Sequence, residues 1–553
     1  MTSGTLRYSP VQNLNLSATI GYNNTTLNQL RMLPISSFKP DAGAVSTTHL
    51  GNGSYASYSI EPQASYALQL GVGKLDLLAG MTWQQGVNDG NYFIGEDFTL
   101  ESQMNNIDAA VNVRSEGMRY SKYRYQAGFA RATYNIDNKY IVNGTFRRDG
   151  SSRFGPDRRV GNFGSVGAAW VFSEEGFVKD NVSFLSFGKL RGSYGVTGND
   201  QIGNYGYMDT WSFNSYPYGG IAGLYPTRVA NPLYSWETTR KLEFGLETGF
   251  WNNRLTLNIN RYYNETDNQL ITSKLPPQVG FEGFTANLPG VVQNRGWEFE
   301  ISSTNFKTSN FEWNTSANLT VATSKLIAYP DLESFQDYER ELYAVGYSME
   351  SVYGYKFTGV DPQTGIAQFE DLSGDGELSD GLDDKYVMGT RLPKFFGGLN
   401  NSFTYKNFNL SFLLQFVKQE GELLNFGYMA PGALGIMTNF DTSVRDRWKQ
   451  PGQIKDIPRS ASTSSDEAYS TYNTYYRHSD ALWGDASYIR LKNLMVSYDF
   501  SSLLPTLKTQ RVMLYGQGQN LLTFTKYNGF DPETQGRVMP PLKQYTVGIR
   551  FTY

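Results

Sequence analysis

The final eleven residues of the chain, KQYTVGIRFTY, alternate between two kinds of side chain. From Tyr545 to Tyr553 every second residue is aromatic or aliphatic, and the residues between them are polar or small. A period of two is typical of a β-strand whose two faces meet different surroundings. The apolar face can lie against a soluble core, or against lipid in a closed transmembrane barrel, where aromatic residues sit at the strand ends.

The same alternation recurs along the chain and predicts a series of two-faced strands. It is clear in NLNLSATIGY (13–22), KLEFGLETGF (241–250), RLTLNIN (254–260) and FNLSFLLQF (408–416). In ASYIRLKNLMVSYDF (486–500) it changes phase around Lys492–Asn493, which predicts a β-bulge. In a membrane barrel these apolar side chains are expected to face lipid: Leu14, Leu16, Phe244, Leu246, Leu255, Leu257, Leu410, Phe412, Ile549 and Phe551.

The connections between the strands are of two lengths. Short turns are expected at 9–12, 136–139, 251–253, 307–310 and 406–407. Long loops follow Val196, Ser324, Lys418 and Tyr22, the last of roughly 30 residues. Short periplasmic turns and long extracellular loops are typical of a bacterial barrel. This count gives about 17 strands, and since bacterial single-chain barrels have even strand numbers, an odd number of strands is expected to precede Met1.

Composition excludes several other classes of protein. The 553 residues contain no apolar run near the length of a transmembrane helix, and the mean hydropathy is −0.44. A net charge of −4 with scattered Lys and Arg gives no nucleic-acid-binding surface. There are no cysteines and two histidines, His49 and His478. A soluble β-sandwich or propeller is the alternative, but no fixed repeat is present and the polar strand faces are rich in Asn, Gln, Glu and Arg.

Longer stretches carry recognisable motifs, beginning with FRRDGSSRFGPDRRVGNFGSVGAAWVFSEEGFV (146–178). The others are KLRGSYGVTGND (189–200), NPLYSWETTRKLEFGLETGFWNNRLTLNINRYYNETDNQLI (231–271), FEDLSGDGELSD (369–380), RLPKFFGGLNNSFTYKNFNLSFLLQF (391–416), DASYIRLKNLMVSYDF (485–500) and GQNLLTFTKYNGFDPETQG (518–536). In this order they resemble the SusC/RagA family of TonB-dependent outer-membrane transporters. Gly164 stands where the family often has Pro, and the resemblance is looser over the first 120 residues.

The resemblance implies an all-β fold, a transmembrane antiparallel β-barrel. About 17 strands of an expected 22 would be encoded here, and the size class is one whose lumen is plugged. Residues 1–553 would form a partial TonB-dependent-receptor barrel domain. The N-terminal extension, the TonB box, the plug domain and the first strands would then be missing.

The resemblance also implies a function in the cell outer membrane, namely uptake of oligosaccharides or peptides, and no enzymatic activity. The implied partners are a SusD-like surface lipoprotein, outer-membrane lipid, and TonB–ExbB–ExbD acting through the missing N-terminal part. A passive porin or a non-functional barrel fragment is the alternative, and a plug and TonB box upstream would distinguish them. A barrel enzyme is a third alternative, for which His478 with Asp480 is the acid–base candidate.

The stretch DLSGDGELSDGLDD (371–384) resembles an EF-hand calcium loop, with oxygen ligands at alternate positions and Gly376 at the sharp turn. Leu382 stands where the motif requires a bidentate Glu. No cofactor is expected apart from a structural calcium; the alternative is an acidic turn that hydrogen-bonds to itself. The candidate ligands are Asp371, Ser373, Asp375, Glu377, Asp380 and Asp383, with Asp384 as a further substitute for the twelfth position.

Two loops, at 207–220 and 469–484, are dense in aromatic residues. Aromatic faces stack on sugar rings, and Tyr hydroxyls add hydrogen bonds; an interfacial girdle of the barrel is the alternative explanation. The candidate substrate-binding residues are Trp211, Tyr216, Tyr218, Tyr472, Tyr475 and Tyr476. The basic stretch RRDGSSRFGPDRR (147–159) is interpreted as a solvated extracellular loop near lipid headgroups.

Overall fold

The computed structural model describes residues 1–39, 43–213, 219–221, 223–275, 277–281, 283–334, 343–423, 442–461, 463–501, 511–535 and 539–552. The chain divides into two compact units. Unit 1 comprises residues 1–169, 193–241 and 266–289, and unit 2 comprises residues 170–192, 242–265 and 290–553.

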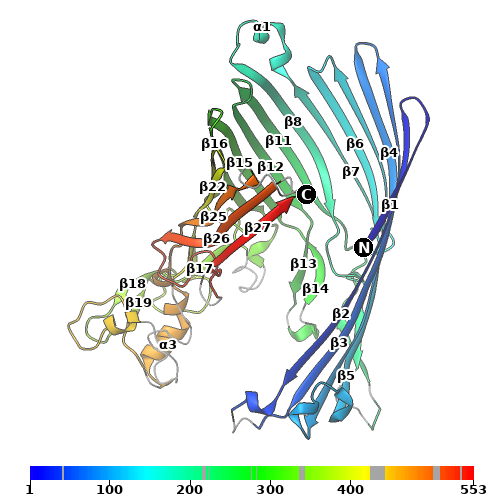
Figure 1. Cartoon of the computed structure of the whole chain (residues 1–553). Coiled ribbons are helices and arrows are strands. Elements are labelled where there is room, and N and C mark those ends of the chain that lie inside the picture. Colours follow the sequence, from blue (N-terminus) through cyan, green and yellow to red (C-terminus); the bar gives the residue numbers. More distant parts are fainter. Residues whose placement is uncertain are drawn as a thin grey trace. The chain divides into compact units, whose positions relative to one another are not determined.

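The fold is almost entirely β (Figure 1), and 17 of the described strands belong to one sheet. This confirms the predicted fold class and strand number. The described helices are short, as in α1 (Gly176–Lys179) and α3 (Glu467–Thr474). No helix within the described residues has the length and apolar character of a membrane span.

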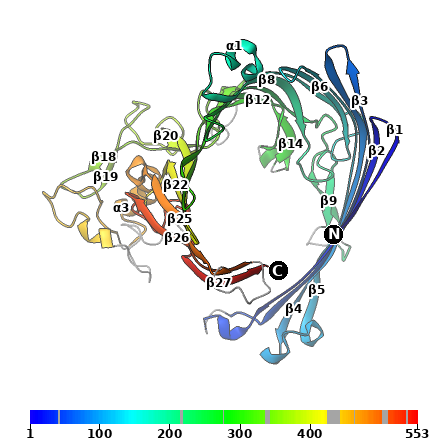
Figure 2. The same ribbon diagram turned by 45° about the horizontal axis from the view of Figure 1, so that its top comes forward.

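Unit 1 is built on a ladder of antiparallel strands that follow one another in the sequence. β1 pairs with β2, and the pairing continues through β3, β4 and β5 to β6. Figure 2 shows β1 to β5 side by side. The bounds are β1 (Thr2–Val11), β2 (Leu14–Leu33), β3 (Thr47–Leu70), β4 (Gly73–Phe98), β5 (Ala110–Ile136) and β6 (Tyr140–Ser151). Two smaller hairpins are β9 (Thr210–Phe213) with β10 (Leu224–Arg228), and β13 (Gln269–Lys274) with β14 (Gly283–Leu288).

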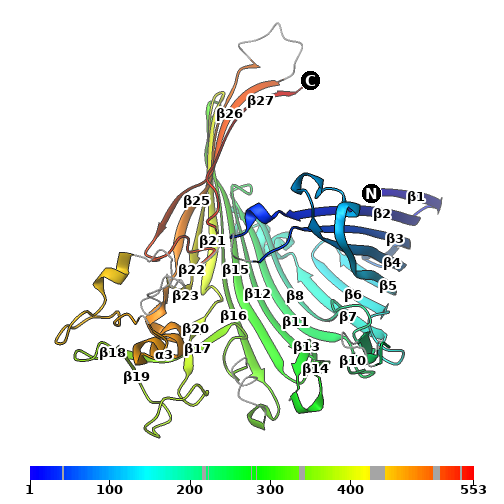
Figure 3. The ribbon, with the colours of Figure 1, turned by 90° about the horizontal axis from the view of Figure 1, so that it is seen from below.

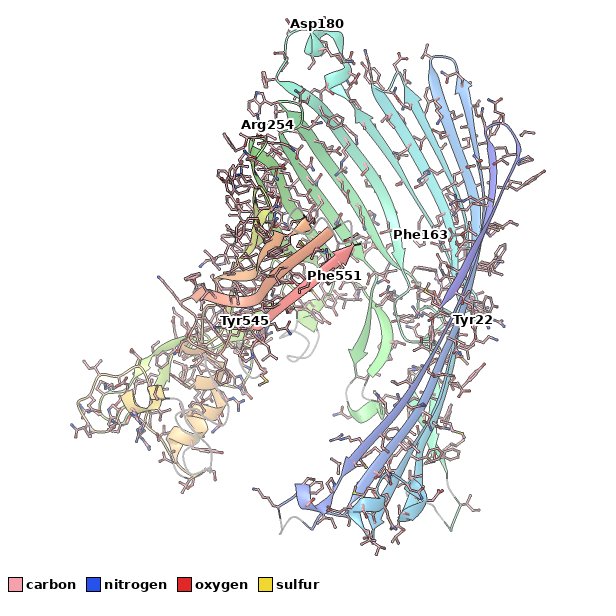
Figure 4. All side chains as sticks on the ribbon, viewed as in Figure 1. Tyr22, Phe163, Asp180, Arg254, Tyr545 and Phe551 are labelled. Carbon is pink, nitrogen blue, oxygen red and sulfur yellow. The ribbon has the colours of Figure 1, made fainter. Side chains whose placement is uncertain are left out.

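Unit 2 carries a second run of antiparallel strands. β15 pairs with β16, and the pairing continues through β21, β22, β25 and β26 to β27. The bounds are β15 (Val291–Lys307), β16 (Phe311–Ala328), β21 (Phe395–Tyr405), β22 (Phe408–Lys418), β25 (Tyr488–Asp499), β26 (Arg511–Thr525) and β27 (Gln544–Thr552). Figure 4 labels Tyr545 and Phe551 toward the two ends of β27. Four strands contribute residues to both units: β7 (Val160–Trp170), β8 (Leu185–Asn199), β11 (Glu237–Phe250) and β12 (Leu255–Asp267).

The short turns and the bulge agree with the sequence. Hairpin turns lie between the predicted strand pairs, and residues in them have positive φ, including Asn13 (69°), Asn138 (58°), Asn252 (57°) and Lys406 (52°). Tight hairpins need such angles because they match the twist of the flanking strands, and Asn tolerates them well. The register of β25 shifts on both of its edges near Lys492, which confirms the predicted bulge.

The connection after Tyr22 differs from the prediction. The sequence pattern predicted a loop of roughly 30 residues there, but β2 continues to Leu33 and pairs with β3 from Thr47 onward. The prediction was wrong because regular alternation ceases there: residues 23–26 are all polar, and Leu27 and Leu30 fall on opposite faces of the strand. The backbone ladder itself does not require an apolar face.

One face of the sheet is apolar across neighbouring strands. In unit 1 the register aligns Leu16, Ala64, Ala79, Ala130 and Phe146 in one row across β2 to β6. The ten side chains expected to face lipid are all partly or fully exposed, and none belongs to a buried core. This exposure is what a surface covered by lipid requires.

The opposite face is polar and internally bonded. In unit 2, Glu247 accepts hydrogen bonds from Arg191 Nε (3.2 Å) and Lys189 Nζ (3.4 Å), and Arg191 also donates to Asn260 (2.6 Å). Polar residues alternate here with the apolar Leu246 on the same strand. The alternation in the sequence therefore separates an apolar face from an ionised one, as the barrel prediction required.

Unit 1 has a small aromatic core among its connecting segments. Phe154, Phe163, Tyr234 and Trp236 are buried against one another, and the Trp236 indole donates to the Arg159 carbonyl (3.1 Å). Figure 4 labels Phe163. The core ties the segment after β6 to the segment that precedes β11.

The connections of unit 2 fold into a module of their own, here called the loop module (residues 343–391 and 442–485). Its strands are β17 (Ser351–Gly354) with β20 (Tyr386–Thr390), β18 (Phe357–Val360) with β19 (Ala367–Phe369), and β24 (Trp483–Asp485), which pairs with β23 (Glu420–Glu422). Figure 3 shows β17 to β20 gathered with α3. Ala367, Tyr472 and Tyr476 form its buried core.

Candidate functional site

The acidic loop at 371–384 is organised by its own hydrogen bonds. Asp371 accepts from the backbone N–H groups of Gly374 (2.6 Å) and Gly376 (2.8 Å) and from the Ser373 hydroxyl (2.9 Å). Asp384 is fully buried and accepts from the N–H groups of Ser379 (2.7 Å) and Ser373 (3.3 Å). The loop is thus folded around two carboxylates, and the more deeply buried one is Asp384.

These bonds fix the charge state of both carboxylates. The N–H groups of Gly376 and Gly374 hold the pKa of Asp371 below its usual value. Burial alone would raise the pKa of Asp384, but the N–H groups of Ser379 and Ser373 outweigh it and lower that pKa. Both groups are therefore ionised at neutral pH, and their oxygens point at backbone donors.

The other candidate calcium ligands lie in different surroundings. Asp380 accepts from the Tyr355 hydroxyl (3.1 Å) and Lys385 Nζ (3.3 Å), and Asp375 accepts from the Glu377 N–H (2.9 Å). Asp383 is exposed. Across the described part of the chain no three His, Cys, Asp or Glu side chains gather closely enough to hold a metal ion. Calcium binding by this loop stays a prediction.

Replacement of Asp384 by alanine is expected to loosen the acidic loop. The change removes the acceptor of two backbone N–H groups, and leaving buried donors unsatisfied costs about 1–3 kcal/mol. Amide hydrogen exchange at Ser373 and Ser379 should become faster. Because the folded-state pKa of Asp384 is lowered, its stabilising effect is present above the unfolded pKa and is lost as the pH falls through the folded pKa.

A change at Asp456, an exposed carboxylate of the same module, serves as the control. Asp456→Asn should leave exchange at Ser373 and Ser379 at the wild-type rate, since only Asp384 accepts from both of these N–H groups. Equal exchange rates in Asp384→Ala and wild type would show that the carboxylate does not organise the loop.

The candidate tyrosines of the second aromatic loop lie mainly inside the protein. Tyr472 and Tyr476 are 2% and 4% exposed, and the Tyr476 ring packs against Phe357 at 5.4 Å between centroids. Tyr475 is half-buried and meets the Tyr355 ring edge-on at 5.0 Å. This packing gives the three rings a structural role in the loop module. Substrate binding by them stays a prediction.

The first aromatic loop is described in part. Trp211 lies on β9, its side chain is 55% exposed, and its indole donates to Asp209 (2.9 Å). Tyr216 and Tyr218 lie outside the described residues. The structure thus leaves Trp211 with an accessible ring, and its predicted contact with substrate is untested.

The histidine–aspartate pair of the enzyme alternative has other partners. Asp480 accepts from the Phe357 N–H (2.9 Å) and the Tyr386 hydroxyl (2.7 Å). Burial and the neighbouring Asp480 raise the pKa of Tyr386 to about 12. Burial lowers the pKa of His478, and the nearby cations Arg477 and Lys385 lower it further. Through these two hydrogen bonds the Asp480 carboxylate links β18 to β20.

The basic stretch at 147–159 is better ordered than its composition suggests. The Arg153 guanidinium lies over the Tyr123 ring at 4.3 Å and donates to the Asp200 carbonyl (2.7 Å). The Asp200 carboxylate accepts from the hydroxyls of Tyr123 (2.8 Å) and Ser151 (2.7 Å). The interpretation as a solvated loop was therefore wrong for Arg153, since a cation–π contact and a carboxylate hold it in place.

A buried ion cluster around Arg490 was missed by the sequence analysis. The Arg490 side chain is 1% exposed and forms ion pairs with Asp531 and Glu533. Its Nε–H group also donates a hydrogen bond to the Thr523 hydroxyl (3.0 Å). The Pro532 carbonyl between the two acids accepts from Gln419 Nε2 (2.7 Å). The cluster fastens the 526–535 segment to β25 and to the end of β22. The alternation of β25 placed Arg490 on the polar face, but no local pattern indicated its partners about forty residues away.

Comparisons with known proteins find one family over nearly the whole chain. The family model described as "TonB dependent receptor-like, beta-barrel" matches residues 2–521. TonB-dependent receptor P3 of Formosa agariphila is 31% identical over 506 residues, covering 86% of this chain and 49% of the relative. The TonB-dependent receptor SusC of Bacteroides thetaiotaomicron is 29% identical over 510 residues, covering 87% of this chain and 48% of SusC.

Solved structures give the same result for the fold. A structure of the RagAB peptide transporter matches with a TM-score of 0.83 and 25% identity, over 99% of this chain and 61% of that one. A second RagAB structure, in an open-open state, matches with a TM-score of 0.83 over the whole chain. The chain spans about half the length of the curated relatives it matches.

Proposed function

Because the chain belongs to the TonB-dependent receptor β-barrel family, we propose that it forms barrel wall and extracellular loops of an outer-membrane nutrient importer. The observation that carries the proposal is the family match over residues 2–521, on a 17-stranded sheet with one apolar and one polar face. The family is one of TonB-dependent transporters and not of enzymes. The described strands would form part of the barrel wall, and lipid would cover their apolar face.

The substrate proposed is an oligosaccharide or a peptide. The likeness to the RagAB peptide transporter supports a peptide, and an oligosaccharide is what the SusC/RagA resemblance implies. We propose a SusD-like lipoprotein as the extracellular partner, and TonB–ExbB–ExbD as the source of energy through a plug and TonB box outside the matched barrel region. The domain assignment that follows from this proposal is a barrel portion over residues 1–553 within a larger transporter.

Uptake measured in the native host tests the function. Deletion of the gene should abolish uptake of a labelled oligosaccharide or peptide that the host uses, and a protonophore should abolish uptake of the same compound in wild type. A passive porin would continue to admit the same compound after the protonophore. Gradient-independent uptake would therefore overturn the proposal in favour of a pore.

A charge placed on the apolar face of β22 is expected to destabilise the protein in the membrane. Leu414→Arg would put a guanidinium against hydrocarbon, which costs about 2–4 kcal/mol near the bilayer midplane. Ser411 lies on the opposite face of the same strand, beside Ser402 of β21. Ser411→Arg should cost far less. Urea unfolding in lipid vesicles measures both, and equal losses would contradict the assignment of the two faces.

A further inference from the structure

The loop module and the segment that follows β16 line a cavity, to which the acidic loop contributes Leu382. Its volume is about 690 Å³, within the range of small-molecule sites. The described polar side chains that line it are three phenols, of Tyr329, Tyr343 and Tyr353, and two carboxylates, of Asp331 and Glu333. All of these residues belong to unit 2.

The cavity is held open by backbone contacts at its base. The segment that carries Tyr343 and Val345 is tied to the end of β16 by two hydrogen bonds, from the Leu326 N–H to the Tyr347 carbonyl (2.8 Å) and from the Gly346 N–H to the Leu326 carbonyl (2.7 Å). Leu326 is fully buried. The Tyr329 and Tyr343 rings meet edge-on at 5.5 Å. These described parts of the wall are therefore held in place by contacts within the protein, which lowers the entropic cost of ordering them when a ligand binds.

The cavity is accessible and lies at the long-loop end of the strand. β16 begins after the short turn at 308–310, so its other end, at Ala328, leads into the long connection. Tyr329 is 8% exposed and lies deep, whereas Asp331, Glu333 and Val345 are exposed at the mouth. In the barrel orientation proposed above, this mouth faces the outside of the cell.

We propose that this cavity binds a primary ammonium or guanidinium group of the transported substrate. Such a group is a pure hydrogen-bond donor that carries a positive charge. Carboxylates accept charge-assisted hydrogen bonds from it, and aromatic faces attract it through their quadrupole. A neutral sugar can donate its hydroxyls to the same carboxylates and stack on the same rings, but it brings no positive charge, so two carboxylates at one cavity favour a cation over it.

Two sources of this cation fit the proposed function: a basic side chain of a peptide, and the free amine of an amino sugar. The claim that the cation belongs to the transported substrate rests on the proposed import function. The claim that the cavity binds a cation does not depend on that function. Both sources share the charge, and matched probes separate them. Gly-Lys-Gly and Gly-Arg-Gly pair with neutral Gly-Gln-Gly, and the glucosamine dimer pairs with its N-acetylated form.

Calorimetric titration of the detergent-purified outer-membrane protein tests the proposal. At least one charged probe should bind about tenfold or more tightly than its neutral partner, and its affinity should fall as NaCl rises. The double variant Asp331→Asn, Glu333→Gln keeps the shapes and should remove this preference. Tyr343→Leu should weaken the charged probe about 2- to 30-fold. The control double variant Asp456→Asn, Glu467→Gln changes the same charge at exposed positions of the loop module and should retain the preference.

Each outcome decides the proposal. Equal affinities within both probe pairs, or equal loss in the two double variants, would overturn it. Preference for the peptide cations alone, or for the amino sugar alone, supports it and identifies the source. Gradient-dependent uptake without any preference for charged probes would refute this site while leaving the import function intact. A clear preference in a protein that transports nothing would leave the site intact and refute the import function.

Discussion

Replacement of Arg490 by methionine is expected to lower the free energy of unfolding by about 3–5 kcal/mol. Arg490 is the buried cation between Asp531 and Glu533, and methionine keeps most of its length without the charge. Asp531 is itself 7% exposed, so the change leaves a buried carboxylate without its cation. The loss comes mainly from that uncompensated charge and less from the ion pair itself.

Urea unfolding of the lipid-embedded protein measures this loss, and proteolysis within 526–535 reports release of the segment. Lys492→Met is the matched control, because Lys492 contacts the same Glu533 (3.3 Å) but is 35% exposed. Partly exposed pairs contribute about 0–1 kcal/mol, so this control should change little. Adding Asp531→Asn to Arg490→Met should recover part of the loss, since the stranded charge is then gone. A midpoint for Arg490→Met within error of wild type would refute the role given to the cluster.

The strands were predictable because the alternation of apolar and polar residues within each strand shows that its two faces meet different surroundings. In β22 every second residue from Phe408 to Phe416 is apolar and the residues between them are polar except Leu413, and both the strand and its faces followed from this pattern alone. The same holds for the turn at Lys406–Asn407 and for the bulge at Lys492. Beyond Tyr22 the apolar residues no longer fall on every second position, so the pattern disappears although the strand continues to Leu33.

The loop contacts were not predictable because they join residues far apart in the sequence. The Asp480 carboxylate accepts from Phe357, which precedes it by 123 positions, and Tyr472 packs in a core with Ala367. Aromatic density in the sequence indicated many rings but not which of them would be buried. Trp211 and Tyr472 come from equally aromatic stretches, yet one is 55% exposed and the other 2%.

The 553-residue chain, expressed alone with a signal sequence, is expected to give no uptake that depends on the proton gradient. The match to the barrel family covers residues 2–521. The matched relatives are about twice as long as the region they share with this chain. In the proposed importer, TonB must act on a part outside the barrel wall. Every strand in lipid also needs partners on both edges, because hydrocarbon satisfies no backbone N–H or C=O group. Each unsatisfied group costs several kcal/mol, so a row of them outweighs the burial gained by the other strands.

The test compares the 553-residue chain with the complete reading frame to which it belongs. Resistance of the folded form to SDS at room temperature, lost on boiling, reports closure of the barrel. Uptake of a labelled peptide or oligosaccharide with and without a protonophore reports energised transport. We expect both properties with the complete reading frame and neither with the 553-residue chain. Gradient-dependent uptake by the chain alone would show that its own strands and loops supply what TonB engages, because no other segment would then be present to do so.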